Sequence, residues 1–323
     1  MLNYEEFAEA FKEGLSAKLG EMPEKGELQF LKKAKINCEV DGITFRKDGS
    51  EIAPCIYIQN YYEMYERVGN LDVVVGEAAK LLYEQRNGLG ITTPKLEPGQ
   101  FDGRIIFQLI NTERNKSLLE DMPHRELEDL SIIYRAFVGN REDIIGSIMI
   151  TDSIAESLKL TEEDLYAQAY ENTREIMKPS VKTMEEVLCK IMGASPIADD
   201  LIDRETGMFK EESGLYVISN NNGIMGASSI LYDDVLQSLA DKLDDNLVVL
   251  PSSLHEVIAL RAGGNTLDNL KSIVHEVNTT QVAVTDLLSD NIYVYDKDAR
   301  TLTMATSDRD LHREAPEHKH SGR

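Results

Sequence analysis

From residue 214 onward the chain alternates short apolar segments with amphipathic ones, and turn residues separate them. The strand-like segments cover residues 214–219, 246–251, 256–262 and, as a hairpin, 291–305. The helix-like segments cover residues 228–243, with Ser228 as the predicted N-cap, and 266–278, with Thr266 as the predicted N-cap. This β-α-β-β-α-β-β order predicts a sheet flanked by helices. A helical connection normally places its two strands parallel, and the third strand is most simply antiparallel to the second.

The rest of the chain also mixes helices and strands, so the predicted fold class is α+β, with mixed sheets and flanking helices. A helix is predicted over residues 3–19 with Asn3 as N-cap, and another from Thr161 through Met177, which opens with a capping pattern. The predicted hairpins cover residues 27–46, with a turn at Asp41-Gly42, and residues 130–150, with a turn at Gly139-Asn140.

The length of 323 residues suggests about two domains of roughly 150 residues each. Residues 194–212 are polar and irregular and are the best candidate for a boundary. We therefore expect an N-terminal α+β lobe over residues 1–195 and a C-terminal α+β lobe over residues 205–305. The polar tail, residues 306–323, has no periodicity and is predicted to be disordered.

The net charge of −23, from 57 acidic and 34 basic residues, narrows the classes of partner. An acidic surface repels phosphate backbones and anionic lipid, so neither nucleic acid nor a membrane is an expected partner. The acids alternate with Lys and Arg inside predicted helices, which is typical of a solvated helix face. An acidic decoy protein of a mobile element stays open as an alternative, and it would require the acids to form one stripe.

Three well-separated cysteines, Cys38, Cys55 and Cys189, exclude a disulfide framework and a cysteine-based zinc site, and they fit a reducing cytoplasm. The N-terminus has no basic start and no apolar core of a signal peptide, and no apolar run approaches the ~20 residues that span a membrane. Three histidines of the tail, His312, His318 and His320, favour adventitious metal binding only. We expect no cofactor, no metal and no catalytic residue.

Two polar loops are predicted to meet at one edge of the C-terminal sheet. If the strands predicted over residues 214–219 and 246–251 run parallel, the residues that follow each strand leave the sheet at the same edge. Open sheets bind ligands at this edge. The ligand-binding candidates are Asn220, Asn221, Asn222, Gly223, Ser252, Ser253 and His255. The leading hypothesis is a non-enzymatic binding or regulatory protein that recognises a protein or a small ligand there.

Three other interpretations compete with this one. A hydrolase or transferase could use Ser253 and His255, which point to the same face of an extended segment, but no G-x-S-x-G elbow is present. The glycines of "NNNGIMGASS" precede a predicted helix and could hold a phosphate, although no P-loop lysine follows. Otherwise the serines satisfy turn backbone groups and His255 begins a strand. The aromatic run over residues 57–68 indicates a core face or, alternatively, a groove for a partner peptide.

Four segments, residues 42–69, 122–138, 169–173 and 246–260, are together distinctive, and "PSSLHEV" is the most distinctive block. They resemble an uncharacterised family of bacterial proteins that is described only as a domain of unknown function and is abundant in gut clostridia. The resemblance covers residues 2–305 and implies a bacterial cytoplasmic protein. It implies no activity and no functional residue.

Overall fold

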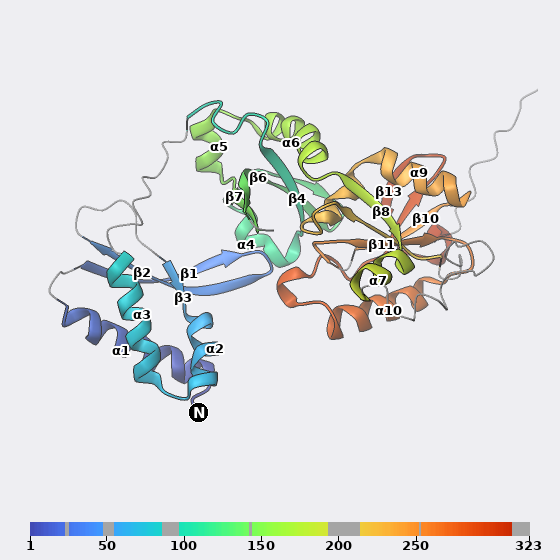
Figure 1. Ribbon diagram of the computed structural model, residues 1–323. Helices are drawn as coiled ribbons and strands as arrows, with labels where there is room; N and C mark the ends of the chain where they lie inside the picture. Colours follow the sequence, from blue (N-terminus) through green and yellow to red (C-terminus); the bar gives the residue numbers. More distant parts are fainter. Residues whose placement is uncertain are drawn as a thin grey trace, which may run out of the picture. The chain divides into compact units, whose positions relative to one another are not determined.

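The computed structural model describes residues 1–22, 26–47, 55–85, 97–141, 144–192, 214–251 and 253–311 (Figure 1). The chain divides into two compact units, Met1–Leu96 and Glu97–Arg323. This division differs from the predicted lobes, because a strand that precedes the predicted boundary, Pro179–Thr183, pairs with the first strand that follows it. The boundary residues themselves, 195–205, lie outside the described ranges.

The first unit packs helices against a three-stranded antiparallel sheet. Its elements are α1 (Tyr4–Gly20), β1 (Gly26–Lys35), β2 (Cys38–Lys47), β3 (Cys55–Tyr57), α2 (Ile58–Val68) and α3 (Leu71–Gln85). As predicted, Asn3 caps α1: its side chain accepts from the Glu6 N–H, and the Glu6 side chain accepts from the Asn3 N–H. Buried Phe7, Phe11 and Ile43 belong to the core between the helices and the sheet.

The predicted hairpin of the first unit exists, but its turn was predicted at the wrong place. Lys35 pairs with Cys38, so the turn is Ile36-Asn37, and Asn37 has a φ of 60°. Asparagine tolerates this left-handed conformation, which allows a two-residue turn. Gly42 lies inside β2 instead, and a Cβ there would lie 3.2 Å from the Cys55 sulfur on β3.

The second unit begins with a four-stranded antiparallel sheet and three α-helices. Its elements are β4 (Ile105–Asn111), α4 (Lys116–Leu119), β5 (His124–Leu127), β6 (Leu130–Arg141), β7 (Ile144–Met149), α5 (Asp152–Leu158) and α6 (Glu162–Ile176). β4 pairs with one edge of β6. β5 and β7 pair with the opposite edge of β6, each along a different part of that strand. The predicted turn residues Gly139 and Asn140 are still paired within this hairpin. Thr161 and Asp164 form the predicted capping box of α6.

A six-stranded antiparallel sheet completes the second unit. Its elements are β8 (Pro179–Thr183), α7 (Met184–Met192), β9 (Tyr216–Asn220), α9 (Asp233–Leu243), β10 (Leu247–Leu250), β11 (Val257–Arg261), α10 (Leu267–Thr280), β12 (Tyr293–Asp296) and β13 (Thr301–Met304). The α+β class and the predicted β-α-β-β-α-β-β order from residue 214 are confirmed. The sheet order is β13-β12-β10-β11-β9-β8. β9 and β10 are both antiparallel to β11, so they run parallel, but β11 separates them and the expected adjacency was wrong.

Two predicted helix caps are replaced by longer-range contacts. The Ser228 hydroxyl lies in a 3-10 helix, Gly226–Leu231, and accepts from the Leu109 N–H of β4 at 3.1 Å, so it caps nothing. The N–H of Leu267, at the start of α10, donates to the Asp308 carboxylate at 2.7 Å, whereas the Thr266 side chain makes no capping bond. Asp308 belongs to a short helix, α11 (Asp308–Leu311), whose Leu311 is buried. The first residues of the predicted disordered tail are therefore ordered, because Leu311 joins the core beneath α10.

A bidentate ion pair joins α6 to α9 and predicts a specific pH dependence. Arg174 donates to the two carboxylate oxygens of Asp234 at 2.8 and 2.6 Å, and these bonds hold the pKa of Asp234 below its usual value. A lowered folded pKa stabilises the protein above the unfolded pKa of about 4, and this stabilisation is lost as the pH falls through the folded value.

We therefore expect Asp234→Asn to lower the free energy of unfolding by roughly 0.5–1 kcal/mol at pH 7 and to have almost no effect near pH 2, since half-exposed pairs contribute little. Urea denaturation at both pH values measures this difference. Glu175→Gln is the matched control, because Glu175 is exposed on α6. An equal loss of stability at the two pH values would contradict the assignment to the ion pair.

Candidate functional site

The two loops that the sequence predicts to converge do lie in contact. The hydroxyl of Ser219, near the end of β9, donates to the backbone carbonyl of His255 at 2.7 Å. The N–H of Met225 donates to the His255 Nδ1 at 3.3 Å, and the N–H of Ala227 donates to the Leu254 carbonyl at 3.3 Å. The Asn220–Gly223 turn and the Ser253–His255 loop thus form one structure at this edge of the sheet. Ser252 lies outside the described residues.

Asn220 organises the first loop. It is buried, and its side-chain oxygen accepts from the N–H groups of Asn222 and Gly223 at 2.9 and 2.8 Å. Its side-chain nitrogen donates to the Ile224 carbonyl at 2.8 Å. This is the local turn that asparagine favours. Asn221, Asn222 and Gly223 are exposed, so they are the parts of the loop that a ligand could reach.

The contacts of Ser253 and His255 do not match those of a serine nucleophile and its base. Ser253 is buried, and its hydroxyl oxygen accepts from the backbone N–H of His255 at 3.0 Å. The His255 Nδ1 accepts from Met225, and its Nε2 lies 3.7 Å from a carboxylate oxygen of Asp286. An acidic partner is present, but both ring nitrogens face groups other than Ser253. In this arrangement His255 has no nitrogen with which to take a proton from the serine.

The loop after β9 also offers little to a phosphate. The N–H groups of Asn222 and Gly223 donate to Asn220, and that of Met225 donates to His255. A phosphate loop needs such groups free and pointing outward. The N–H groups of Ala227 and Ser228 likewise have backbone acceptors.

The exposed part of this edge opens into a groove of about 660 Å³. Its floor is one face of the sheet, where Lys182, Val217 and Ile258 lie side by side across β8, β9 and β11. Ser180 and Ser219 pair in the next row, and Glu256, two residues before Ile258, faces the same side. One wall is α7, and the open end is the Asn220–Gly223 turn. The remaining lining residues, all from α7, are Met184, Val187 and Lys190.

The groove lies beside the core that α10 covers. Ile258 lines the groove and also packs on the core cluster that includes Val248 and Leu250 of β10. Figure 1 shows α7 and α10 on the same side of this sheet, with α9 on the opposite side. Tyr216 of β9 and Leu239 of α9 accordingly line a separate hollow on that opposite face. Helix α10 therefore covers only part of this face of the sheet, and the groove lies over the part that remains open.

Three charged side chains line the groove, and they are the feature that most restricts its ligands. Lys182 and Lys190 lie on the β8 and α7 side, and Glu256 lies on the β11 side. None of the three forms an ion pair with another residue in the part of the chain that the structure describes. Two lysines without an ion-pair partner among the described residues are notable in a chain whose acidic residues outnumber its basic ones by 57 to 34.

The sequence predicts the open end of the groove and two strands of its floor, residues 214–219 and 256–262, but not that they form a groove. The edge strand β8 is not predicted, although Pro179 excludes a continuing helix and "PSVKT" alternates polar and apolar residues. Lys182 and Lys190 lie in no recognisable motif, and Glu256, although it belongs to the "PSSLHEV" block, carries no pattern that predicts its place in a groove. Their proximity depends on β8 pairing with β9 and on β11 lying on the other side of β9.

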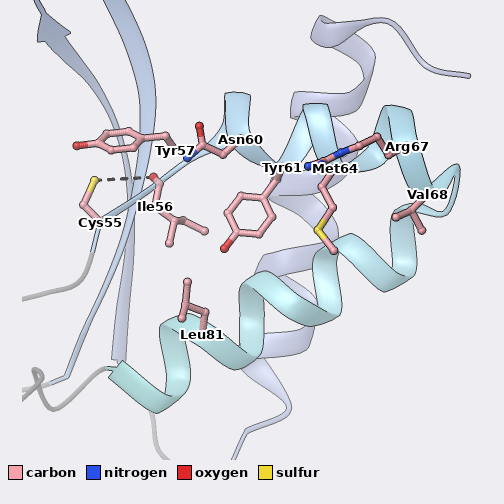
Figure 2. A pocket seen from close by; sticks show the side chains of 9 residues that line it. All are labelled: Cys55, Ile56, Tyr57, Asn60, Tyr61, Met64, Arg67, Val68 and Leu81. Atoms are coloured by element: carbon pink, nitrogen blue, oxygen red, sulfur yellow. Dashed lines mark hydrogen bonds between the residues drawn. The ribbon is translucent and has the colours of Figure 1, made fainter. Parts of the chain in front are cut away.

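A second hollow, of about 720 Å³, lies within the first unit. In Figure 2, Tyr61 and Met64 of α2 and Leu81 of α3 surround it together with Ile56 of β3. Tyr61 stacks on Phe11 of α1 with ring centroids 5.3 Å apart, and burial raises its pKa. The aromatic run that the sequence singles out therefore contributes both to the core and to this hollow.

The described ranges contain neither a metal-ligand cluster nor a membrane-spanning helix. No group of three or more His, Cys, Asp or Glu side chains there could hold a metal ion. None of the helices there combines the length and the hydrophobicity that crossing a bilayer requires. The tail histidines fall outside those ranges.

The comparison with protein families matches residues 4–297 to a family described as a family of unknown function (DUF5688). The chain belongs to this family. The match spans both units and every residue of the groove, and it confirms the predicted resemblance to an uncharacterised domain family. Comparison with curated proteins and with solved structures finds no match.

Proposed function

We propose that this chain is a non-enzymatic binding protein that holds a small polar ligand, or a short segment of a protein partner, in the groove over β8, β9 and β11. The observation that carries the proposal is the groove itself, with an apolar floor, a polar open end and three charged side chains that form no ion pair within the described ranges. Its volume of about 660 Å³ lies in the usual range for ligand sites. The contacts of His255 favour binding over hydrolysis, because both ring nitrogens face groups other than Ser253.

We also propose that the protein acts in the cytoplasm of a bacterium, without nucleic-acid or membrane partners. The three cysteines are free thiols, which supports a reducing compartment. The net charge of −23 opposes binding to phosphate backbones and anionic lipid.

A matched pair of substitutions on β8 tests the groove. Ser180 faces the groove, and Val181, the next residue, faces the opposite side of the sheet. We expect a screen of polar metabolites, amino acids and short peptides to give ligands that stabilise the wild type. A ligand at 100 times its Kd should add about 2.7 kcal/mol. Ser180→Tyr should abolish the stabilisation by filling the groove, whereas Val181→Tyr should retain it.

Thermal-shift measurements on the full chain, followed by calorimetric titration of each ligand, provide both readouts. Ligands that bind Ser180→Tyr as tightly as the wild type would contradict the proposal. So would a screen in which no compound binds the wild type.

A further inference from the structure

We infer that the ligand of this groove is a short peptide with free termini, bound with its α-ammonium group at Glu256 and its α-carboxylate at Lys182 and Lys190. This inference rests on the proposed function, because it names the ligand class of the same groove. The observation behind it is the separation of the charges between the two sides of the groove.

The charges are divided in the way that a ligand with two oppositely charged ends requires. Glu256 comes from the β11 side, and both lysines come from the β8 and α7 side. A simple anion would meet the lysines but would also face the Glu256 carboxylate, which repels it. A simple cation would face two lysines. A ligand with an ammonium group at one end and a carboxylate at the other satisfies all three side chains.

The spacing of the strands sets the length of this ligand. Lys182 and Ile258 are separated by β9, hence by two strand spacings, or about 10 Å. Glu256 lies two residues farther along β11, about 7 Å, so the Cα atoms of Lys182 and Glu256 are about 12 Å apart. An extended tripeptide spans up to about 10 Å. A free amino acid carries both charged groups on one carbon atom, so it could meet both sides only if the Lys182 and Glu256 side chains leaned toward each other over the apolar floor.

The surface between the charges suits the middle of such a peptide. Val217 and Ile258 form an apolar floor, and Met184 and Val187 of α7 add an apolar wall that can take a central apolar side chain. The exposed side-chain amides of Asn221 and Asn222 stand at the open end, where they can bond to peptide groups of the ligand. Tripeptides with an apolar central residue are therefore the expected class.

Blocked peptides test each end of the ligand separately. The probes are Ala-Leu-Ala and Ala-Phe-Ala with free termini, the same peptides N-acetylated, the same peptides C-amidated, and free leucine. In calorimetric titrations with the full chain we expect each free tripeptide to bind at least roughly tenfold more tightly than either blocked form and than leucine.

Variants then assign each end of the peptide to its side chain. Glu256→Gln should bind the free and the N-acetylated peptide equally well, and still discriminate against the amide. Lys182→Gln combined with Lys190→Gln should bind the free and the amidated peptide equally well, and still discriminate against the acetylated form. Lys242→Gln is the control, because Lys242 lies by the hollow on the opposite face of the sheet, and it should behave as the wild type.

The outcomes separate this inference from the proposed function. Blocked peptides that bind as tightly as free ones would overturn the inference, and so would variants that weaken all probes equally. If no tripeptide binds but Ser180→Tyr abolishes binding of a compound of another class, the inference fails and the proposed function stands. If no compound of any class binds, both fail.

Discussion

Replacing Gly226 with alanine is expected to lower the free energy of unfolding of the Glu97–Arg323 unit by about 3 kcal/mol or more. A Cβ atom at this position would overlap the His255 carbonyl oxygen and would lie 2.8 Å from the Asn220 backbone nitrogen. Both neighbours are backbone atoms held by the contact between the two loops, so neither can move without separating them. The Ser219 hydroxyl would lie closer still, and it already donates to the same carbonyl.

Hydrogen exchange of peptides from β9 and β11, measured by mass spectrometry, reports this loss of stability within the second unit. Gly263→Ala is the matched control in the same unit. Its added Cβ would lie 3.1 Å from a carboxylate oxygen of Asp245, a flexible side chain that can shift, so we expect a small effect. Wild-type protection of β9 and β11 in Gly226→Ala would show that the two loops are not held together as described.

Replacing Asp129 with alanine is expected to destabilise the same unit by roughly 3 kcal/mol, because several partners depend on this one carboxylate. Asp129 accepts hydrogen bonds from the Ser289 hydroxyl at 2.7 Å, from the Asn291 side chain at 2.9 Å and from the Tyr293 hydroxyl. Tyr293 is fully buried, and burial together with the bond to Asp129 raises its pKa. Without Asp129, its hydroxyl would stay buried without that acceptor.

A double-mutant cycle with Tyr293→Phe isolates this bond. In the wild type we expect Tyr293→Phe to cost about 1 kcal/mol, and in the Asp129→Ala background much less, because the hydroxyl has already lost its acceptor. Urea denaturation followed by circular dichroism measures the four free energies. Glu126→Ala, at an exposed position on β5, is the control. Strictly additive effects would mean that Tyr293 and Asp129 do not stabilise each other.

Local features of the fold could be predicted where the deciding contacts lie within a few residues. The capping boxes of Asn3 with Glu6 and of Thr161 with Asp164 connect positions three residues apart, so their sequence pattern specifies them. The hairpin turn of the first unit shows the limit of such patterns. Asp41-Gly42 is the stronger turn signal, but strand pairing places Asn37 in the turn and Gly42 in the sheet.

The candidate site could be predicted only in part, for the same reason. The convergence of the residues after β9 with those before β11 follows from the order of the elements, and the sequence predicts it. The partners of His255 do not follow from that order. Met225 lies 30 residues before it, Asp286 lies 31 residues after it, and neither position carries a recognisable motif. Their positions depend on how complete loops pack.

The sequence by itself determined the α+β class, the order of elements from residue 214 and the edge of the sheet at which two polar loops meet. These features depend on hydrophobic periodicity, turn residues and chain connectivity, which are all local. Only the tertiary structure decided that β11 lies between β9 and β10, that β8 joins the sheet as its edge strand, and that Lys182, Lys190 and Glu256 line one groove. Such proximity between distant segments is set by strand register and by burial of the shared core, because a register shift of one residue would turn the groove side chains of that strand to the opposite face of the sheet.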